Sequence, residues 1–337
     1  MRGILLLSIL AVLALTWWYY KLLSRAPQPS PQAVEVLVPT GSSLTQLNRQ
    51  LWQLGLVRDT AVLRQIAEQL LIKTDSLRGG RFFIEPGSAP RDILRHILYG
   101  KQVPVRLVLH DQRELTDLAA RAARYLEPDS TAFMQYFLDS NTWQKLELRP
   151  ESLLSLFIPN TYEIYWNTSP ADFVRRMRVE HERFWNSRRR QQAAQLGLRP
   201  DEVYTLASII ERETRQDSEK QRMAGVYYNR LQRNMLLQAD PTAVFASRDF
   251  HTRRVTQRHL RVDSPYNTYR YKGLPPGPIT MPSIASIDAV LNLERHDLLF
   301  FCARGDGSGL HNFAATLSEH KENAARYRKN KKQKAIK

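Results

Sequence analysis

Two glutamates, Glu211 and Glu213, lie two residues apart near the end of a segment with helical periodicity. Val203, Leu206 and Ile210 recur in this segment at a spacing that places them on one face of a helix. At 3.6 residues per turn, Glu213 falls about 40° from the centre of that apolar stripe, whereas Glu211 lies about 120° away. A carboxyl group that faces packed side chains loses hydration, and this loss raises its pKa. Glu213 is therefore a candidate general acid that holds its proton near neutral pH.

A structural role is the competing interpretation of the same residues. Arg212 and Arg215 stand beside the two glutamates, and charged residues near helix ends are usually solvated or paired. Taken alone, the helix favours a Glu213 that caps the helix end or pairs with one of these arginines.

Five sequence strings in and after this helix change the balance between the two interpretations. They are LASIIERET (206–214), VYYNRL (226–231), LLQADPTAVF (236–245), SPYNTYR (264–270) and GLPPGPI (273–279). In this order and with these short spacers, they resemble the endolytic peptidoglycan transglycosylases of the YceG-like family. The resemblance extends over most of the chain. In that family the second acid of the E-x-E-T string is the catalytic one, and here that position is Glu213.

The resemblance implies a substrate and a reaction. The substrate is the glycan strand of peptidoglycan, and the bond cut is the β-1,4 link from N-acetylmuramic acid to N-acetylglucosamine within the strand. One carboxyl group serves first as acid and then as base, so the products carry 1,6-anhydro ends and no water, metal ion or organic cofactor is required. The resemblance also implies that cleavage ends the elongation of nascent strands, and it suggests the peptidoglycan synthases as partners.

Polar and aromatic residues of the later strings are candidates for holding the sugar. The candidate substrate-binding residues are Gln238, Asp240, Tyr266, Asn267, Thr268 and Tyr269. The amides and the threonine hydroxyl offer the donors and acceptors that sugar hydroxyl and N-acetyl groups need. The tyrosines can stack on sugar faces or donate a hydrogen bond to the carboxyl group. Asp240 precedes a proline, so it either fixes a turn or raises the pKa of Glu213 through its charge.

Three further motif residues are candidates for positioning the acid without contacting the substrate, namely Glu211, Glu219 and Asn229. A purely structural role is equally consistent with the sequence for each of them.

The chain opens with an apolar run over residues 4–20 that ends in four aromatic residues. Seventeen residues at about 1.5 Å each span about 25 Å, and an aromatic cluster suits a membrane interface. Bulky aromatics stand where a signal peptide would need small residues for cleavage. The sequence therefore predicts a transmembrane anchor over residues 1–25. The resemblance then implies a single-pass protein of the cell inner membrane, with its catalytic domain on the periplasmic side.

The remaining chain divides by pattern into a proline-rich linker (26–32), a small module (33–102), a connecting α+β region (103–197) and a catalytic domain with a basic tail (198–337). In the module, a strand, two amphipathic helices and a second strand follow one another. This β-α-α-β order resembles the LysM-like glycan-binding module of the family, although a packing unit without a ligand fits the pattern equally well. The predicted fold class is α+β, with an N-terminal transmembrane helix and with the acid on a helix of a mixed helix and strand catalytic domain.

The charge leaves two other functional classes to consider. The formal net charge is +16, and residues 326–337 hold seven cations. Such blocks are more often solvated or disordered than folded. A nucleic-acid binder would explain the charge, but it leaves the apolar N-terminal run unexplained, and the sequence has no zinc-finger spacing or aromatic-interleaved RNA-binding string. A wall-binding protein without activity would share the anchor and the module, but it leaves the acid-bearing strings unexplained.

Overall fold

The computed structural model describes residues 8–17, 32–59, 62–69, 76–252 and 254–336. These residues form a mixture of helices and short antiparallel strand pairs. The chain divides into two compact units. Unit 1 contains the described residues up to Leu107 together with Tyr125–Pro128 and Tyr162–Ser169, and unit 2 contains Val108–Arg124, Asp129–Thr161 and Pro170–Lys337.

The prediction of an N-terminal transmembrane helix is wrong, and with it the prediction of a single-pass protein of the inner membrane. Of the apolar run 4–20, residues 8–17 are described and are helical, whereas 4–7 and 18–20 lie outside the described residues. A span needs about 20 apolar residues in one helix. Within the part of the chain that the structure describes, no helix is long and apolar enough to cross a membrane. The Pro-rich linker predicted at 26–32 lies almost wholly outside the described residues.

Unit 1 is built on one strand pair and three helices. Its elements are β1 (Val34–Val38), α2 (Leu44–Gln53), α3 (Val62–Gln69), β2 (Gly80–Ile84) and α4 (Pro90–Tyr99). The two strands are antiparallel, with Val36 opposite Phe82. Helix α2 begins with a capping box, in which the Ser43 hydroxyl accepts from the backbone N–H of Gln46 and the Gln46 side chain accepts from that of Ser43.

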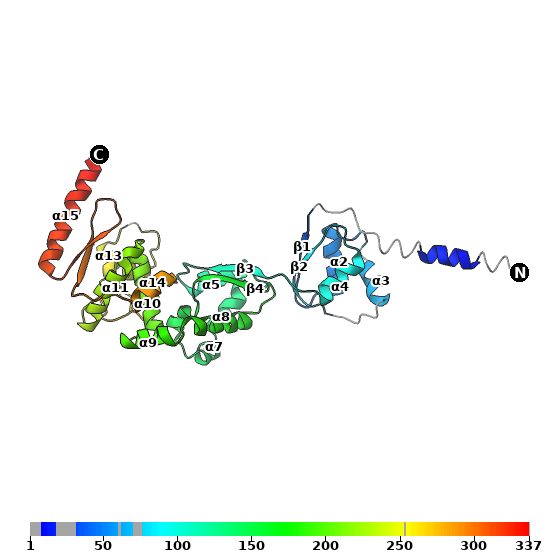
Figure 1. Cartoon of the computed structure of the whole chain (residues 1–337), viewed down its shortest axis with the longest axis horizontal. Coiled ribbons are helices and arrows are strands. Elements are labelled where there is room, and N and C mark those ends of the chain that lie inside the picture. Colours follow the sequence, from blue (N-terminus) through cyan, green and yellow to red (C-terminus); the bar gives the residue numbers. More distant parts are fainter. Residues whose placement is uncertain (1–7, 18–31, 60–61, 70–75, 253, 337) are drawn as a thin grey trace. The chain divides into compact units, whose positions relative to one another are not determined.

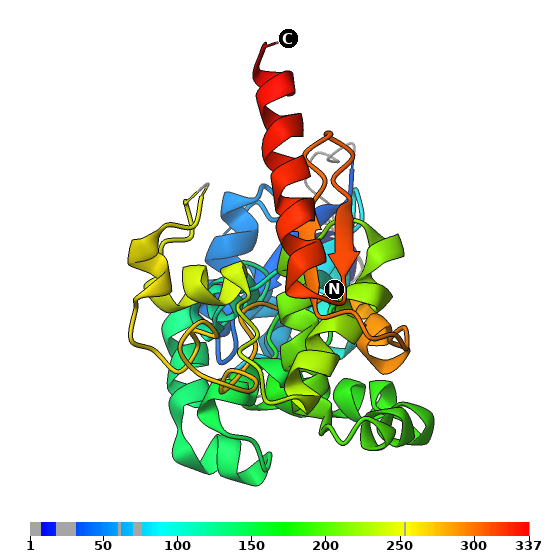
Figure 2. The same cartoon turned by 90° about the vertical axis from the view of Figure 1, so that its left-hand side faces the viewer.

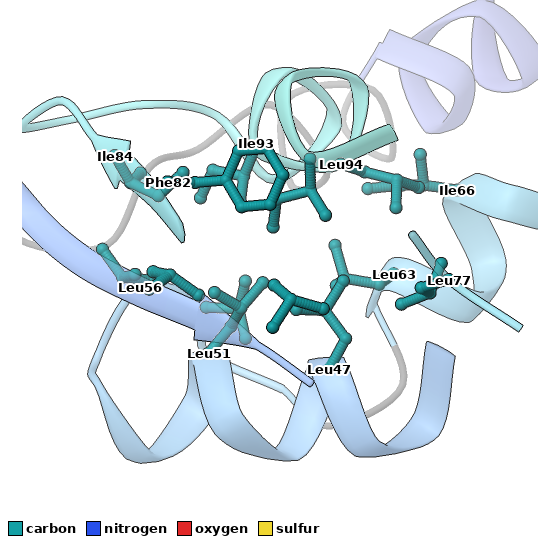
Figure 3. Packing of buried hydrophobic residues seen from close by; sticks show 14 of the residues in the cluster. Leu47, Leu51, Leu56, Leu63, Ile66, Leu77, Phe82, Ile84, Ile93 and Leu94 are labelled. Carbon is teal, nitrogen blue, oxygen red and sulfur yellow. The ribbon is translucent and has the colours of Figure 1, made fainter. Parts of the chain in front are cut away.

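The core of unit 1 lies between these strands and helices (Figure 3). Leu47 and Leu51 of α2, Phe82 of β2 and Ile93 and Leu94 of α4 are all buried there. Each fully buried side chain of this size contributes about 1.5–3 kcal/mol relative to an exposed one. The alternating burial of β2 and the i, i+3, i+4 spacing of the helices explain why the sequence pattern predicts these elements.

The first part of unit 2 is mainly helical. The elements between residues 105 and 195 are β3 (Val105–Leu109), α5 (Leu115–Ala123), α6 (Ser130–Leu138), α7 (Ser140–Lys145), the 3-10 helix η1 (Pro150–Leu156), β4 (Asn160–Ile164), α8 (Pro170–Phe184) and α9 (Ser187–Gln195). The division between the units runs through β3 and β4, since residues 105–107 and 162–164 belong to unit 1. Strands β3 and β4 pair with each other. Four buried phenylalanine rings pack in a closed series. Phe133 contacts Phe137 and Phe173, and Phe157 contacts the same two rings, with ring centres 5.5–6.1 Å apart. These contacts hold α6 and α8 together.

The second part of unit 2 surrounds one buried helix. Its elements are α10 (Pro200–Glu213), α11 (Asp217–Gln232), α12 (Asp240–Ser247), α13 (Gln257–Leu260), α14 (Ile284–Leu291), β5 (Phe300–Ala303), β6 (His311–Ala314) and α15 (Leu317–Ile336). Helix α10 contacts α11, α12 and α14, and its apolar stripe is fully buried. Strands β5 and β6 form a hairpin. Figures 1 and 2 both show α15 lying along this hairpin.

The C-terminal basic block is helical rather than disordered, and its described cations Arg326, Arg328, Lys329 and Lys331 are exposed to solvent. Helix α15 continues through residues 326–336. Its first turns pack on β5 and β6, where Asn323 is buried and its amide donates to the carbonyl oxygen of Phe313. The same helix therefore places basic side chains of the block near the hairpin end of unit 2.

Candidate active site

Glu213 is the last residue of helix α10. The helix begins with Pro200 in its first turn, and the backbone N–H of Arg199 donates to the Glu202 carboxylate at 2.8 Å. It ends because Thr214 adopts an extended conformation, with φ −139°. The C-terminal end of a helix has a partial negative charge, which disfavours an ionised carboxylate there. The backbone position alone therefore favours a protonated Glu213.

The Glu213 carboxyl group has one hydrogen-bond donor among the described residues. The Tyr227 hydroxyl, on helix α11, donates to its Oε1 at 2.6 Å. Burial raises the pKa of Glu213 to about 7, the hydrogen bond from Tyr227 opposes this rise, and the negative charge of Asp240 adds to it. Burial also raises the pKa of Tyr227 well above its usual value, so Tyr227 remains a donor. Glu213 is thus poised between its two protonation states near neutral pH.

Glu213 lines two neighbouring cavities of unit 2. The larger has a volume of about 940 Å³, and its wall includes Asp240, Phe245 and Phe250. The smaller has a volume of about 270 Å³ and also contains Glu213 and Asp240, together with Gln238 and other residues. The carboxyl group is therefore reachable from both cavities although its helix is packed inside the unit. Such a position suits an acid that acts on a bond in the middle of an extended substrate.

Three of the six candidate substrate-binding residues share a cavity with Glu213. Gln238, Asp240 and Tyr269 all line the smaller cavity. The Tyr269 hydroxyl donates to Asp240 Oδ1 at 2.6 Å, and burial and the Asp240 charge raise the pKa of Tyr269, so it remains a donor. Arg230 donates to the Gln238 side-chain oxygen at 3.2 Å, which leaves the Gln238 amide nitrogen free to face a ligand.

Tyr266 lies in a different cavity. It lines a space of about 340 Å³ that also contains Phe245, and the Phe245 and Tyr266 rings are 4.8 Å apart. Phe245 also lines the large cavity, so its ring lies on the wall between the two spaces, whereas Tyr266 faces only the smaller of them. Aromatic faces in such a position can support the apolar face of a sugar ring.

The other two candidates organise the loop that carries the tyrosines. The buried Asn267 amide donates to the carbonyl oxygens of Leu260 and Val262, at 3.1 and 2.8 Å, and its oxygen accepts from the N–H of Tyr269. The buried Thr268 hydroxyl contacts the Thr242 hydroxyl at 2.7 Å and accepts from the N–H of Ala239. These hydrogen bonds orient Tyr266 and Tyr269 rather than offering donors to a ligand.

Glu211 binds the N-terminus of helix α14 instead of facing the cavities. Its Oε2 accepts from the backbone N–H of Ser283 at 3.1 Å and from the hydroxyls of Ser283 and Ser286 at 2.6 and 2.5 Å. Lys220, which is buried, lies 3.5 Å from the same oxygen. Burial acts to raise the pKa of Glu211, but the bonds from Ser283 and Ser286 and the charge of Lys220 outweigh it and lower the pKa.

Glu219 and Asn229 hold helix α11 against the β5–β6 region. Both Glu219 oxygens accept from His311, one from its N–H and one from its ring Nδ1, each at 2.9 Å. The Asn229 amide donates to the carbonyl oxygens of His296 and Leu298 at 2.6 and 3.0 Å. Because Tyr227 lies on α11, these contacts also hold in position the hydroxyl that donates to Glu213.

Tyr227 is the main site residue that the sequence reasoning missed. It lies in the matched string VYYNRL, but two tyrosines stand side by side there and no sequence signal separates them. The structure does separate them, because Tyr228 donates to the carbonyl oxygen of Leu196 while Tyr227 donates to Glu213. Phe245, Phe250 and Arg113 of the large cavity were also missed. Arg113 comes from a segment far from the other two, and Phe245 carries no signal of its own within its matched string.

Comparisons with known proteins give a matching family model and similar curated proteins. The family model described as the YceG-like family matches residues 36–326. An endolytic murein transglycosylase from Bacillus subtilis is 39% identical over 132 residues, which cover 39% of this chain and 36% of the relative. One from Streptococcus pneumoniae is 25% identical over 332 residues, which cover 88% of this chain and 59% of the relative. The chain thus spans less than two thirds of the length of these curated relatives.

A solved structure is also similar. The 2.6 Å crystal structure of a yceG-like protein from Listeria monocytogenes superposes with a TM-score of 0.57 and 26% identity, covering 87% of this chain and 99% of that one. The family model alone spans well over half of the sequence. The chain belongs to the YceG-like family.

Proposed function

We propose that this protein is an endolytic murein transglycosylase, with Glu213 as its acid and base. The observation that carries the proposal is the Glu213 carboxyl group, which has a pKa of about 7 and lines a cavity of about 940 Å³. The names of the relatives from Bacillus subtilis and Streptococcus pneumoniae support the same reaction class. The bond cut is the β-1,4 link from N-acetylmuramic acid to N-acetylglucosamine inside a glycan strand.

In the first half of the reaction, Glu213 acts as a general acid. Because the Tyr227 hydroxyl occupies Oε1, the proton to be donated resides on Oε2. It passes to the glycosidic oxygen as the bond from C1 of the muramic acid to that oxygen breaks, and the N-acetylglucosamine leaves with a free 4-hydroxyl group. Glu213 is left as a carboxylate that the Tyr227 hydrogen bond stabilises.

In the second half, the same group acts as a general base. The 6-hydroxyl oxygen of the muramic acid attacks C1 while its proton returns to Glu213. A C1–O6 bond forms, the sugar becomes a 1,6-anhydro product, and no water is consumed. A pKa near the working pH suits one group that must both donate and accept a proton.

The neighbouring residues adjust this cycle. The charge of Asp240 raises the pKa of Glu213 and so favours the proton-bearing form that begins the reaction. Gln238 and Tyr269 line the smaller cavity beside the acid, where an amide and a hydroxyl can bind sugar hydroxyl and N-acetyl groups. Phe245 and Tyr266 offer aromatic faces to a sugar further along the strand.

An interior cut has a biological consequence that we include in the proposal. A nascent strand that is cut inside its length loses its growing portion, so cleavage ends its elongation. Such an enzyme would work where synthases extend strands, which makes peptidoglycan synthases the expected partners.

The test of the proposed function is the end group of the product. Purified glycan strands are incubated with the full chain, and the fragments are analysed by mass spectrometry in water enriched in ¹⁸O. We expect 1,6-anhydro ends that contain no ¹⁸O. Reducing ends that contain ¹⁸O would show a hydrolase, which commonly uses a second carboxylate. Binding of strands without any new ends would show a wall-binding protein.

A further inference from the structure

The wall of the large cavity is strongly cationic. Five of its residues are basic, namely Arg113, Arg212, Arg254, Arg328 and Lys331. The acidic residues among those described on the wall are Glu213 and Asp240. Glu213 must hold its proton to act, so during binding Asp240 is the one ionised acid against five cations. The hydroxyl and N-acetyl groups of sugars carry no charge, so they have no need of such a wall.

Most of these cations are not neutralised by the protein. Arg212 forms an ion pair with Asp111 and donates to the Thr280 hydroxyl at 2.9 Å. Among the described residues, no salt bridge is found for the other four basic residues of the wall. Arg113 lies over the Phe250 ring, 4.6 Å from its centre, and Lys331 lies over the Tyr327 ring, 5.8 Å from its centre. Both contacts hold a cation in place without cancelling its charge.

The cations come from four separate segments that meet at the cavity, because Arg212 lies on α10. Arg113 precedes helix α5, Arg254 lies between α12 and α13, and Arg328 and Lys331 lie on α15. Arg328 and Lys331 are exposed and three residues apart, so they share one face of the helix. Cationic side chains that converge from different segments on the space beside the acid indicate a ligand with several negative groups.

We propose that this cationic wall binds the carboxylates of the peptide stems on the glycan strand, so that strands bearing stems are preferred over stem-free strands. This inference rests on the proposed function and names its substrate more closely. The stem is attached to the muramic acid, the sugar whose bond is cut, so its carboxylates lie near the reacting bond. Guanidinium groups bind carboxylates with two parallel hydrogen bonds, which gives arginine an advantage at such a site.

A diphosphate at the end of a lipid-linked strand is another anionic group that a nascent strand can carry. It occurs once per strand and at the end, whereas stems occur at every muramic acid. An acid that is reachable from two cavities suits a cut inside the strand, far from that end. The stems are therefore the better match to a wall placed around the acid.

The experiment compares three substrates, namely strands with stems, strands whose stems an amidase has removed so that each muramic acid keeps only its lactyl carboxylate, and stem-free strands with a lipid diphosphate end. The variant Arg328→Gln/Lys331→Gln removes two cations of the wall. Lys321→Gln/Lys329→Gln removes the same charge from exposed positions of the same helix that are not part of the wall. Arg254→Gln tests the wall without touching α15. The measured quantity is kcat/KM for each substrate at low and high salt.

We expect the unmodified protein to cleave strands with stems with the higher kcat/KM. Loss of Arg328 and Lys331 should lower kcat/KM for these strands by about three- to tenfold, chiefly through KM, while stem-free strands change little. Arg254→Gln should act in the same direction, the Lys321/Lys329 control should behave as the unmodified protein, and high salt should remove the preference.

Equal cleavage of strands with and without stems by the unmodified protein would overturn the inference and leave the proposed function intact. So would an equal loss on both substrates in the Arg328/Lys331 variant, or a preference that follows the diphosphate. A protein that cleaves none of the three substrates would overturn the proposed function itself.

Discussion

Two glutamate carboxyl groups at the C-terminal end of helix α10 lie in environments that shift their pKa values in opposite directions. On one side, the Glu211 carboxylate accepts three hydrogen bonds from Ser283 and Ser286 and lies beside Lys220, and its pKa is lowered. On the other side, Glu213 accepts one bond from Tyr227 and lies near the negative charge of Asp240, and its pKa rises to about 7. Two residues of sequence thus separate a group whose pKa is lowered from one whose pKa is raised to about 7.

The difference shows what decides the role of a carboxyl group in this fold. Burial acts to raise the pKa of both groups. The number of donors and the sign of the nearest charge then decide the outcome. Glu211 uses its charge to hold the N-terminus of α14 and so fixes the end of α10, whereas Glu213 keeps the freedom to donate a proton to whatever enters the cavity.

The largest effect is expected for Glu213→Gln, which keeps the size of the side chain but removes its proton chemistry. Positioned acid–base catalysis is commonly worth about 10²–10⁴ in rate, and one group serves both steps here, so turnover should fall by about 10⁴ or more. The fold should persist. Because folding raises the pKa of Glu213, its ionisation costs stability once the pH exceeds the pKa of the unfolded chain. The glutamine variant lacks this ionisable group, so at pH 8 it should melt at or above the temperature of the unmodified protein. Normal turnover in a folded Glu213→Gln would contradict the assignment.

The second variant, Tyr227→Phe, removes the donor to Glu213. Loss of a hydrogen bond to a charged group costs about 1.5–3 kcal/mol, so turnover should fall by about ten- to a hundredfold. Without this bond the Glu213 pKa rises, and the alkaline limb of the kcat–pH profile should move to higher pH. Tyr228→Phe is the matched control, because its hydroxyl donates to the backbone of Leu196. Equal pH profiles for the two phenylalanine variants would argue against a role for the Tyr227 hydroxyl.

The third variant, Asp240→Asn, should move the alkaline limb of the kcat–pH profile to lower pH. Removal of the negative charge lowers the Glu213 pKa, so less of the enzyme carries the proton at neutral pH and turnover falls there by a few-fold. Activity should recover at lower pH. The amide oxygen of asparagine can still accept from Tyr269, so the loop should keep its position. A profile that moves to higher pH would show that Asp240 acts on something other than Glu213.

The smallest effect on turnover is expected for Glu211→Gln, whose main effect should be on stability. A neutral glutamine accepts the hydrogen bonds from Ser283 and Ser286 less well than a carboxylate does. This loss costs about 1–3 kcal/mol of the free energy of unfolding and lowers the melting temperature by several degrees. The lowered pKa of Glu211 means that its stabilisation is present above the unfolded pKa of about 4.3 and is lost as pH falls through the folded value. The difference in melting temperature should therefore shrink in acid.

Asp217→Asn is the control for Glu211→Gln, because it removes the exposed partner of the same Lys220. Exposed pairs contribute little, so its melting temperature should hardly change. A folded Glu211→Gln without activity, beside an active Glu213→Gln, would reverse the roles of the two glutamates.

Much of the fold follows from local pattern. The strand Val34–Val38 and the helix after it were predicted from alternation, from a 3.6-residue period and from the Ser43–Gln46 capping box, and all of these are local signals. Residues 4–20 were predicted to span a membrane from their hydropathy, their aromatic cluster and the lack of a fitting cleavage site. This prediction is wrong, since no helix of the described residues is long and apolar enough to cross a membrane. The helix through the basic block at the C-terminus was not predicted, because the contacts of α15 with the hairpin cannot be read from composition.

The site was harder to predict where it depends on residues that meet across the fold. The position of Glu213 relative to its own helix could be worked out from the helical period. The choice of Tyr227 over Tyr228, and the assembly of Arg113 and Arg328 on one wall, depend on packing between distant segments. Asn267 and Thr268 were predicted to bind the substrate because they are polar and lie in a matched string. Their side chains instead form hydrogen bonds that hold the loop in place.

The central claim is that Glu213, and not Glu211, holds a proton near neutral pH. It can be tested without a substrate by a pH titration of ¹³C-labelled glutamate side-chain carboxyls in NMR, comparing the unmodified protein with Glu213→Gln and Glu211→Gln. The account predicts one carboxyl resonance that titrates with a pKa of about 7 and that is missing only in Glu213→Gln. A resonance with that pKa that persists in Glu213→Gln, or that disappears in Glu211→Gln instead, would contradict it.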